Sequence, residues 1–251
     1  MVVLVAISAA VYVAILLPFK MFPLIPGITE LRPATAIPPL ASFLFGPAAA
    51  WGMALGNLIG DFAGTFGPAS AFGFLGNFLL GWVPYRMWRA MSREPLPSIF
   101  GARAAGAGSS FRWTELAEYA FIVVVASAAC ALVIGWGGGL LLGLFPPRVV
   151  APVILANNVA WGLLATPLLA RAVAPRVRSW GLTADQLLPA EEPSGPSPAR
   201  LVGLFLTPAA SLGGFLLLYF LTGSPAAATG LDARWLLAIP SALVFVGTAL
   251  L

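Results

Sequence analysis

Two polar side chains that could bind a solute, Asn57 and Asp61, lie in the apolar segment GMALGNLIGDFAG, residues 52–64. Residues four apart share one face of a helix, so the amide and the carboxylate are expected close together. A charged residue at the bilayer centre costs about 2.5–3.5 kcal/mol on the insertion scale, which makes an intramembrane carboxylate a candidate functional group. Asp61 has two interpretations: it reaches the outer membrane interface, or it lines a polar pocket that opens outward.

More polar residues are expected at a similar depth in two other apolar segments. Asn77 lies early in the next segment, and Asn157 and Asn158 lie about two turns into a later one. Polar groups from three spans at one depth favour the pocket over the interface. Trp161 is close to these asparagines in the sequence, and its ring would suit stacking on a flat solute.

The loop that precedes these spans carries two further charged candidates. Residues 20–40, KMFPLIPGITELRPATAIPPL, contain five prolines, Glu30 and Arg32. Proline fixes its own backbone φ, so such a loop is stiff without being helical. Two interpretations stay open: the charges are held over the pocket like a lid, or Glu30 and Arg32 pair with each other.

The composition requires a membrane to position these residues. Of the 251 residues, 60% are hydrophobic and 9% are charged, whereas soluble domains carry about 25% charged residues. The chain has no histidine and one cysteine, Cys130, so we predict no metal site, no disulfide framework and no cofactor. The predicted fold class is an all-α, polytopic helical membrane protein.

Eight apolar segments are candidate spans, and the loops between them predict the orientation. The spans are predicted at about 2–18, 34–46, 47–66, 69–90, 115–144, 149–171, 201–222 and 233–251. Both Arg-rich loops, 86–112 and 171–200, then fall on the side of the N-terminus, which the positive-inside rule places in the cytoplasm. We therefore predict a multi-pass protein of the inner (plasma) membrane with a cytoplasmic N-terminus.

The predicted spans divide into three regions. Residues 1–172 form a six-span domain, residues 173–200 a flexible cytoplasmic linker rich in Pro, Ser, Ala and acid, and residues 201–251 an additional two-helix hairpin. The second span is short and begins in a proline-rich segment, so it is broken or re-entrant in this interpretation. The fifth is long and either tilts or ends in an irregular turn at Gly137–Gly139.

Small residues recur every four positions in two of the spans. Gly52, Gly56, Gly60 and Gly64 predict a helix face that packs closely against a neighbour, because helices in lipid associate mainly through small residues. In the first span Ala6, Ala10 and Ala14 form a second ladder. Its significance depends on whether another subunit packs there.

Three stretches together resemble a known family. The first span reads LVAISAAVYVAIL, the second and third read PLASFLFGPAAAWGMALGNLIGDF, and the sixth reads PVILANNVAWGLL. This order of spans, with its G-P…G…G-N…G-D pattern, is similar to the substrate-binding S component of energy-coupling factor (ECF) transporters. The resemblance covers about residues 1–172.

The resemblance implies a six-helix protein that binds a vitamin, a precursor or a metal ion from outside. S components release the solute by toppling in the membrane, in complex with a transmembrane coupling subunit and two cytoplasmic ATPase subunits. The outer loop closes over the ligand, and an Ala-x-x-x-Ala motif, which Ala6, Ala10 and Ala14 fit, contacts the coupling subunit. The residues expected in the pocket are Glu30, Arg32, Asn57, Asp61, Asn77, Asn157, Asn158 and Trp161.

We therefore expect the membrane-embedded, solute-binding subunit of an ATP-driven importer for a small organic micronutrient, without catalytic activity of its own. The histidine and N-terminal metal-binding features of the cobalt and nickel members are missing, which disfavours a metal substrate. No Walker motif occurs in the chain, so another chain would hydrolyse ATP. The alternatives are a membrane enzyme acting on a lipid or prenyl substrate and a membrane scaffold protein.

Overall fold

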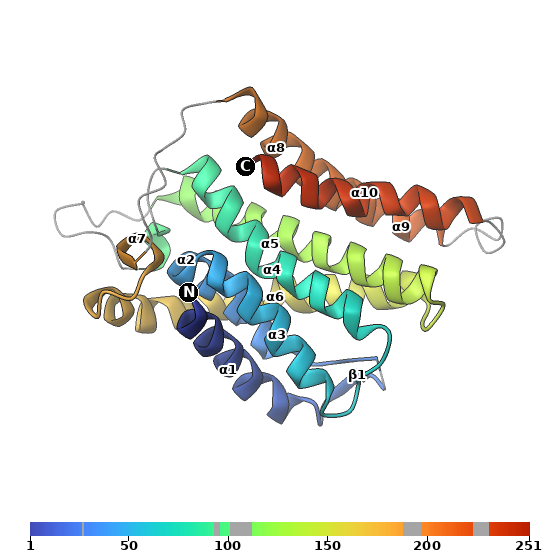
Figure 1. The fold of residues 1–251 in the computed structure, drawn as a ribbon, viewed down its shortest axis with the longest axis horizontal. Coiled ribbons are helices and arrows are strands. Elements are labelled where there is room, and N and C mark those ends of the chain that lie inside the picture. Colours follow the sequence, from blue (N-terminus) through green and yellow to red (C-terminus); the bar gives the residue numbers. More distant parts are fainter. Residues whose placement is uncertain (27, 93–95, 101–111, 188–196, 223–230) are drawn as a thin grey trace.

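The apolar segments form a helical bundle in the computed structural model of the chain (Figure 1). The structure describes residues 1–26, 28–92, 96–100, 112–187, 197–222 and 231–251, with only the backbone described for 231–233. The main helices are α1 (Val2–Phe19), α2 (Ile37–Phe45), α3 (Pro47–Asp61), α4 (Ser70–Met91), α5 (Trp113–Ile134), α6 (Pro147–Ser179), α8 (Pro198–Pro208), α9 (Gly214–Leu221) and α10 (Leu231–Leu250). This confirms the predicted all-α fold of a polytopic membrane protein.

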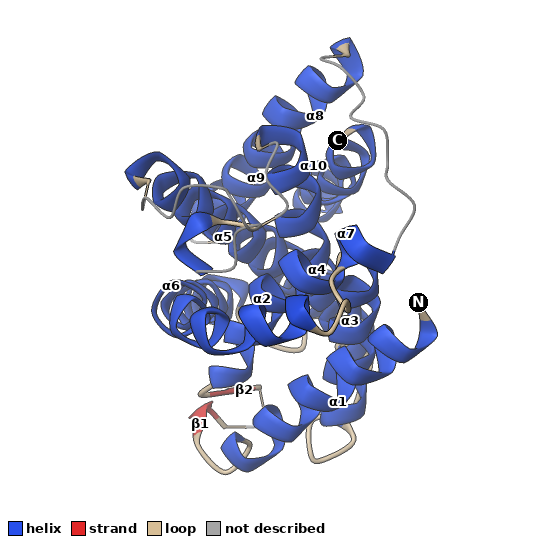
Figure 2. Cartoon of the chain, turned by 90° about the vertical axis from the view of Figure 1, so that its left-hand side faces the viewer, coloured by secondary structure: helices blue, strands red, loops and turns tan. Residues whose placement is uncertain are grey.

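Four helical stretches of the described chain are long and apolar enough to cross a bilayer by themselves. They are Val2–Phe19, Trp113–Leu141, Pro147–Leu187 and Pro198–Leu221. The shorter apolar helices, among them the stretch Pro33–Phe45, complete the bundle between them (Figure 2).

The loop after α1 folds into a small β-hairpin. Strand β1 (Pro23–Ile25) pairs antiparallel with β2 (Thr29–Glu30), and a 3₁₀ turn, Pro33–Ala36, leads into α2. The proline-rich loop thus contains short paired strands, and Arg32, which follows them, is held against Asn57 of α3 and Asn157 of α6. We call this end of the bundle the β-hairpin end, and the opposite end, where Met1 lies, the N-terminal end.

The glycine face of α3 packs against α1 at Gly52, Gly56 and Gly60, which confirms close helix packing there. Gly64, the fourth glycine of the predicted face, lies beyond the end of α3, and nothing lies within 4 Å of its Cβ position. A Cβ added at Gly56 would lie 3.0 Å from Tyr12 Cδ1, and one at Gly60 would overlap Leu16 Cδ2. At Gly52 it would overlap Ser8 and lie 3.0 Å from the Val5 carbonyl oxygen. The two backbones approach this closely only because the α3 residues lack side chains.

The fifth predicted span ends irregularly, as expected, but as a π-helical segment instead of a turn. It runs over Gly135–Leu141, and Phe72 packs where a side chain of Gly137 would lie. The ring of Phe145 lies against Gly138, where a Cβ would come within 2.6 Å of Phe145 Cζ. The glycines thus leave room for aromatic rings beside a widened helix.

The N-terminal end of the bundle has a tightly packed aromatic core. The Phe43 ring meets Trp88 and Phe100 edge to face, with ring centroids 5.5 Å and 5.4 Å apart. Tyr119 packs on the same cluster, and its hydroxyl donates a hydrogen bond to the Gly162 carbonyl. These contacts join α2, α4, α5 and α6.

The C-terminal helix pair, residues 198–250, lies on the opposite side of the bundle from α1 (Figures 1 and 2). Its first rod is α8 and α9 joined by a π-helical segment, Ala209–Gly213, and α10 is the second. Gly203 and Gly247 let the rods touch, because a Cβ at Gly203 would lie 2.8 Å from the Gly247 carbonyl oxygen.

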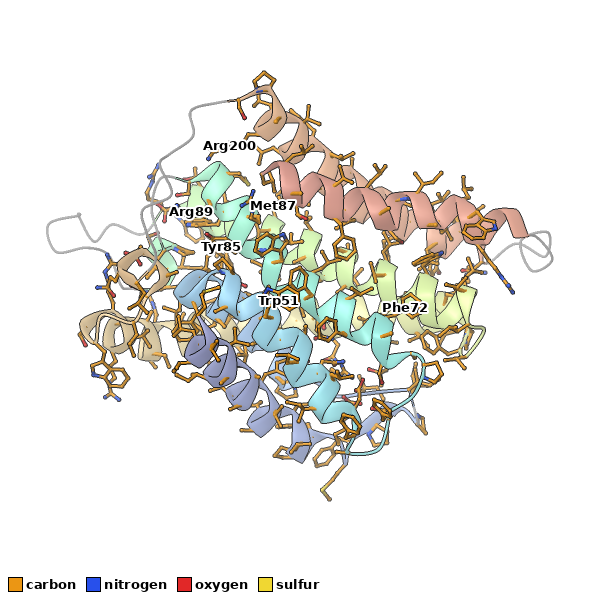
Figure 3. All side chains as sticks on the ribbon, viewed as in Figure 1. Trp51, Phe72, Tyr85, Met87, Arg89 and Arg200 are labelled. Carbon is orange, nitrogen blue, oxygen red and sulfur yellow. The ribbon has the colours of Figure 1, made fainter. Side chains whose placement is uncertain are left out.

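Two arginines, Arg200 and Arg86, tie this pair to α4 at the N-terminal end. Figure 3 labels Arg200 and Arg89. Arg200 Nη2 donates hydrogen bonds to the carbonyl oxygens of Arg89 and Ala90, at 2.6 and 2.9 Å. Arg86 Nε donates to the Thr248 carbonyl oxygen at 3.2 Å, near the end of α10. Each arginine therefore satisfies carbonyl groups at the C-terminus of a helix, where no intrahelical donor remains.

Of the predicted linker, residues 173–179 continue α6 and residues 188–196 lie outside the described residues.

Candidate solute-binding site

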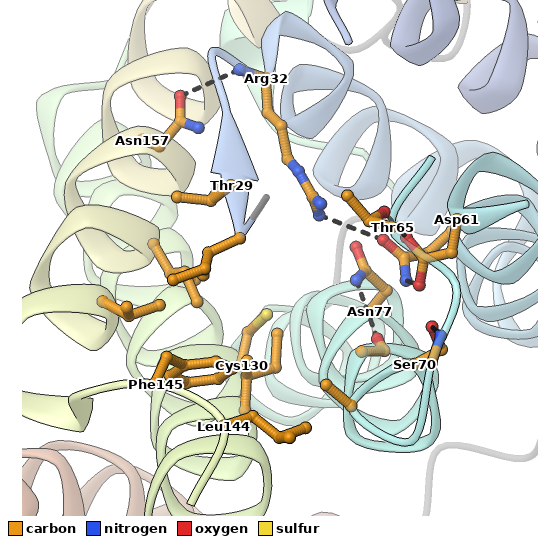
Figure 4. Close-up of a pocket in the computed structure, with 18 of the residues that line it drawn as sticks. Thr29, Arg32, Asp61, Thr65, Ser70, Asn77, Cys130, Leu144, Phe145 and Asn157 are labelled. Atoms are coloured by element: carbon orange, nitrogen blue, oxygen red, sulfur yellow. Dashed lines mark hydrogen bonds between the residues drawn. The ribbon is translucent and has the colours of Figure 1, made fainter. Parts of the chain in front are cut away.

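A cavity of about 270 Å³ lies at the β-hairpin end, between that hairpin and helices α3 to α6 (Figure 4). Its polar side comes from the loop, α3, α4 and α6, and its apolar side from the facing ends of α5 and α6. The lining residues are Ile28, Thr29, Arg32, Asn57, Asp61, Thr65, Gly67, Pro68, Ala69, Ser70, Gly73, Asn77, Cys130, Ile134, Leu144, Phe145, Val150, Ile154, Asn157 and Asn158.

Arg32 connects the loop to two helices across the cavity. Its Nε donates to Glu30 Oε1 at 2.7 Å, and its Nη1 donates to Asn57 Oδ1 on α3 at 3.1 Å. The backbone N–H of Arg32 donates to Asn157 Oδ1 at 3.3 Å, and Asn157 Nδ2 donates to the Glu30 carbonyl oxygen at 3.0 Å. The loop is therefore held to both α3 and α6.

Asp61 is the centre of a second polar group at the cavity wall. Its Oδ2 accepts from Asn57 Nδ2 at 3.3 Å, and its Oδ1 accepts from Thr65 Oγ1 at 3.1 Å. Lys20 Nζ lies 3.7 Å from Oδ1 and donates to Thr65 Oγ1 at 2.6 Å. Burial lowers the pKa of Lys20, an effect that the nearby Glu30 and Asp61 carboxylates oppose.

The charged groups of these two networks balance. Arg32 pairs with Glu30, and Lys20 with Asp61, so among the described residues the two networks hold two positive and two negative groups. In such a pair the attraction between the partners offsets part of the cost of burying each charge. The pairing of Glu30 with Arg32, one of the two interpretations of the loop, is thus present, and it coexists with a position of Arg32 over the cavity.

Asn77 is held by a residue that sequence reasoning did not single out. The hydroxyl of Tyr12, a fully buried side chain of α1, donates to Asn77 Oδ1 at 3.0 Å. Asn77 Nδ2 donates to the Gly73 carbonyl oxygen at 2.9 Å, one turn back along α4. Tyr12 reaches Asn77 across α3 because Gly56 leaves space for its ring. A lone tyrosine in an apolar first span carries no local signal of this contact.

Asn158 differs from the other polar lining residues because its amide has no partner among the described residues. The side chain is only 4% exposed, and Nδ2 is buried without a hydrogen bond. A buried donor left unpaired costs about 1–3 kcal/mol. A hydrogen-bond acceptor on a ligand in the cavity would satisfy it.

Six of the eight predicted pocket residues line the cavity, and two do not. Glu30 is buried behind the lining residue Arg32, whose Nε donates to its carboxylate. Trp161 on α6 is half-buried and is not among the lining residues. Phe62 and Phe66, which follow Asp61 in the sequence, also lie outside the lining: both are exposed and they stack on each other, with centroids 4.2 Å apart.

The aromatic residue that does line the cavity is Phe145. It lies between the π-helical segment and α6, in a short apolar turn. The sequence shows Gly137–Gly139 before it but not that its ring turns back over these glycines into the cavity wall.

The alanine ladder of α1 lies on a free face. Ala6, Ala10 and Ala14 are all exposed, and the buried residues of α1 face α3 instead. Two ladders of small residues thus have different surroundings, since the glycines of α3 are covered and the alanines of α1 are open. No group of three or more metal-ligating side chains occurs among the residues that the structure describes.

Comparisons with known proteins agree with this architecture over the first two-thirds of the chain. A family model described as the QueT transporter matches residues 2–174, which include the loop, the cavity and α1 to most of α6. Comparisons with curated proteins and with solved structures found no match. The predicted resemblance to S components is confirmed, because QueT is an ECF transporter S component. The chain belongs to the QueT transporter family and is a membrane S component that transports a solute.

Proposed function

We propose that the cavity at the β-hairpin end captures a queuosine precursor, the solute associated with the QueT family, from outside the cell. Such a precursor is a small deazapurine base, flat and uncharged in its ring system, with ring N–H donors and a carbonyl acceptor. A cavity of about 270 Å³ is slightly smaller than the 300–1,000 Å³ typical of drug-sized ligands. A single base is a ligand of suitable size for it.

The unpaired amide of Asn158 is the observation that carries this proposal. Asn158 Nδ2 is a buried donor without a partner among the described residues, and the ring carbonyl of the base would accept its hydrogen bond. The Asp61 carboxylate would accept from N–H groups of the same base, since each oxygen has capacity beyond its present partners. Phe145 would cover a ring face.

Binding of 7-deazaguanine to the purified protein in detergent tests this assignment. Asn158→Leu keeps the branched arrangement of four side-chain heavy atoms and removes the donor, and we expect its Kd to rise at least tenfold by isothermal titration calorimetry. Ser241→Ala is the matched control, because its hydroxyl bonds within α10, away from the cavity. Equal affinity of Asn158→Leu and the wild type would contradict the role of this amide, and absence of wild-type binding would contradict the solute class.

We propose further that the chain has no catalytic activity of its own and works with partner subunits. We infer that a transmembrane coupling subunit docks on the open face of α1, at Ala6, Ala10 and Ala14, and that two cytoplasmic ATPase subunits drive release. The exposure of all three alanines supports this docking face. Ala10→Trp should abolish co-purification of partner subunits while solute binding is retained, and survival of the complex would show that α1 is not the docking face.

The proposed orientation places the N-terminal end in the cytoplasm of a plasma-membrane protein. Arg86 and Arg89 near the end of α4, and Arg176 and Arg178 near the end of α6, supply the positive charge that supports it. The β-hairpin end, with the cavity, then faces outward. An epitope inserted before Met1 should be accessible only after the cell membrane is permeabilised, and labelling of intact cells would reverse the orientation.

A further inference from the structure

The C-terminal helix pair lies beyond the residues that match the family, 2–174, and its contacts assign it a role at the cavity. The apolar wall of the cavity is made by the end of α5, the following turn and the start of α6. The cavity-facing residues of this wall are Ile134, Leu144, Phe145, Val150 and Ile154. The same stretch of chain touches the C-terminal pair on its other side.

Close packing joins the wall to the pair at two glycines. A Cβ at Gly135 would lie 2.7 Å from Leu218 Cδ2 of α9, next to the cavity-lining Ile134. A Cβ at Gly214, which begins α9, would lie 2.7 Å from Leu132 Cδ2 of α5. The two helices therefore touch with no space for an additional methyl group.

Two polar contacts also join the wall to the C-terminal pair. Trp136 Nε1 donates to the carbonyl oxygen of Arg234, in α10, at 2.8 Å. The guanidinium of Arg148, at the start of α6, lies over the Tyr219 ring at 5.0 Å from its centroid. Lipid chains could replace neither an acceptor for an indole N–H nor an aromatic face for a guanidinium.

The apolar wall of the cavity depends on contacts with the C-terminal pair because its π-helical segment is rich in glycine. The π-helical segment contains Gly135 and the run Gly137–Gly139, so few of its own side chains can hold it in place. Glycine also loses more conformational freedom on ordering than other residues. The Phe72 and Trp136 rings, which meet edge to face at 5.8 Å, extend the contact from α4 to the pair.

We propose that the C-terminal helix pair acts as a buttress that positions the apolar wall of the cavity, with Trp136 as the main positioning residue. The pair is anchored at its far end by Arg86 and Arg200, so it is fixed to the bundle at both ends. The effect of the helix pair on ligand affinity rests on the proposed function, whereas its effect on the shape of the cavity wall is independent of it.

The single cysteine allows a test of wall geometry without any ligand. Cys130 lines the cavity and is buried, so its reaction with a small methanethiosulfonate reagent reports how tightly the wall closes around it. Trp136→Phe keeps the aromatic ring and removes the bond to Arg234. We expect Cys130 labelling to be at least fivefold faster in this variant, with a thermal midpoint within about 2 °C of the wild type. Trp235→Phe is the control, because Trp235 is 62% exposed beside the same contact, and its rate should be unchanged.

Affinity for 7-deazaguanine is measured on the same variants, where Trp136→Phe should raise Kd three- to tenfold. An unchanged labelling rate in Trp136→Phe, or an equal increase in Trp235→Phe, would overturn the buttress. Faster labelling together with absent wild-type binding of the base would support the buttress and contradict the proposed solute. The two proposals therefore fail in different ways.

Discussion

The two ends of the bundle are built in opposite ways. At the β-hairpin end, Arg32, Asn57 and Asp61 surround a cavity of about 270 Å³. At the N-terminal end, Phe43 and Trp88 fill the space between helices, and the cavity bounded by them and by Asp185 of the short helix α7 (Ala184–Leu187) has only about 20 Å³. A solute can therefore be held at one end, and the other end is closed by packing.

A turn at the closed end shows how tightly it is filled. Gly46, between α2 and α3, has φ +56°, a conformation that favours glycine. A Cβ there would also lie 3.1 Å from Tyr85 Cε2 and 3.2 Å from the Cβ of Ala184 in α7. The tight packing at this end fits the toppling of the whole subunit that the family resemblance implies.

The largest expected effect comes from breaking the polar end. Arg32→Met leaves the buried Glu30 carboxylate without its cation, and removing one partner of a buried pair costs about 3–5 kcal/mol. We expect a loss of stability of this order in chemical denaturation and at least a hundredfold weaker binding of 7-deazaguanine. The double variant Arg32→Met/Glu30→Met should regain much of the stability but not the binding. Independent, additive effects of the two substitutions would show that the pair is not coupled.

Breaking the aromatic end should change stability without changing affinity. Trp88 is buried against Phe43, and truncating such a ring costs about 3 kcal/mol or more through lost contacts and a residual void. Trp88→Ala should lower the thermal midpoint of the purified protein while the folded fraction keeps the wild-type Kd. A large rise in Kd at a temperature where the variant is folded would mean that the two ends are not independent.

Gly56 precedes the cavity-lining Asn57 on α3 and packs against Tyr12 of α1, so its substitution should change both stability and affinity. Gly56→Ala places a methyl group 3.0 Å from Tyr12 Cδ1 and 3.1 Å from the Ala9 carbonyl oxygen, so α1 and α3 must separate slightly. Overpacking of this kind costs about 1–3 kcal/mol. Because Tyr12 holds Asn77, we also expect a modest rise in Kd. Gly213→Ala is the control, since nothing lies within 4 Å of its Cβ position and its backbone is helical, so it should lower neither stability nor affinity.

The smallest expected effect is a dependence of stability on pH through Lys20. Burial lowers the pKa of Lys20 from its ordinary 10.5, so the folded chain releases this proton at a lower pH than the unfolded chain. Between the two pKa values the unfolded state binds more protons, and stability should therefore rise as pH approaches 10.5. Lys20→Arg keeps a cation that does not titrate in this range, so its thermal midpoint should lack this rise. The same slope in both proteins would assign the effect to another group.

Several features of the chain follow from local sequence alone. A 60% hydrophobic chain with eight apolar segments is expected to form membrane helices, because backbone groups in lipid must bond within their own segment. Helical periodicity likewise places Asn57 beside Asp61 and the glycines of α3 on one face. The family resemblance and most of the polar lining residues follow from these patterns, since depth in the membrane can be counted along each span.

Tertiary structure decided which faces meet. The glycine face could have met any neighbour, and only the fold shows that it meets α1, so that Tyr12 reaches Asn77. Phe145 lines the cavity and Trp161 does not, because the π-helical segment of α5 turns one ring inward and the rotation of α6 keeps the other outside. The docking of the C-terminal pair on Gly135 is equally non-local. Periodicity along one helix is a property of its own residues, whereas contacts between helices depend on the shapes of both partners.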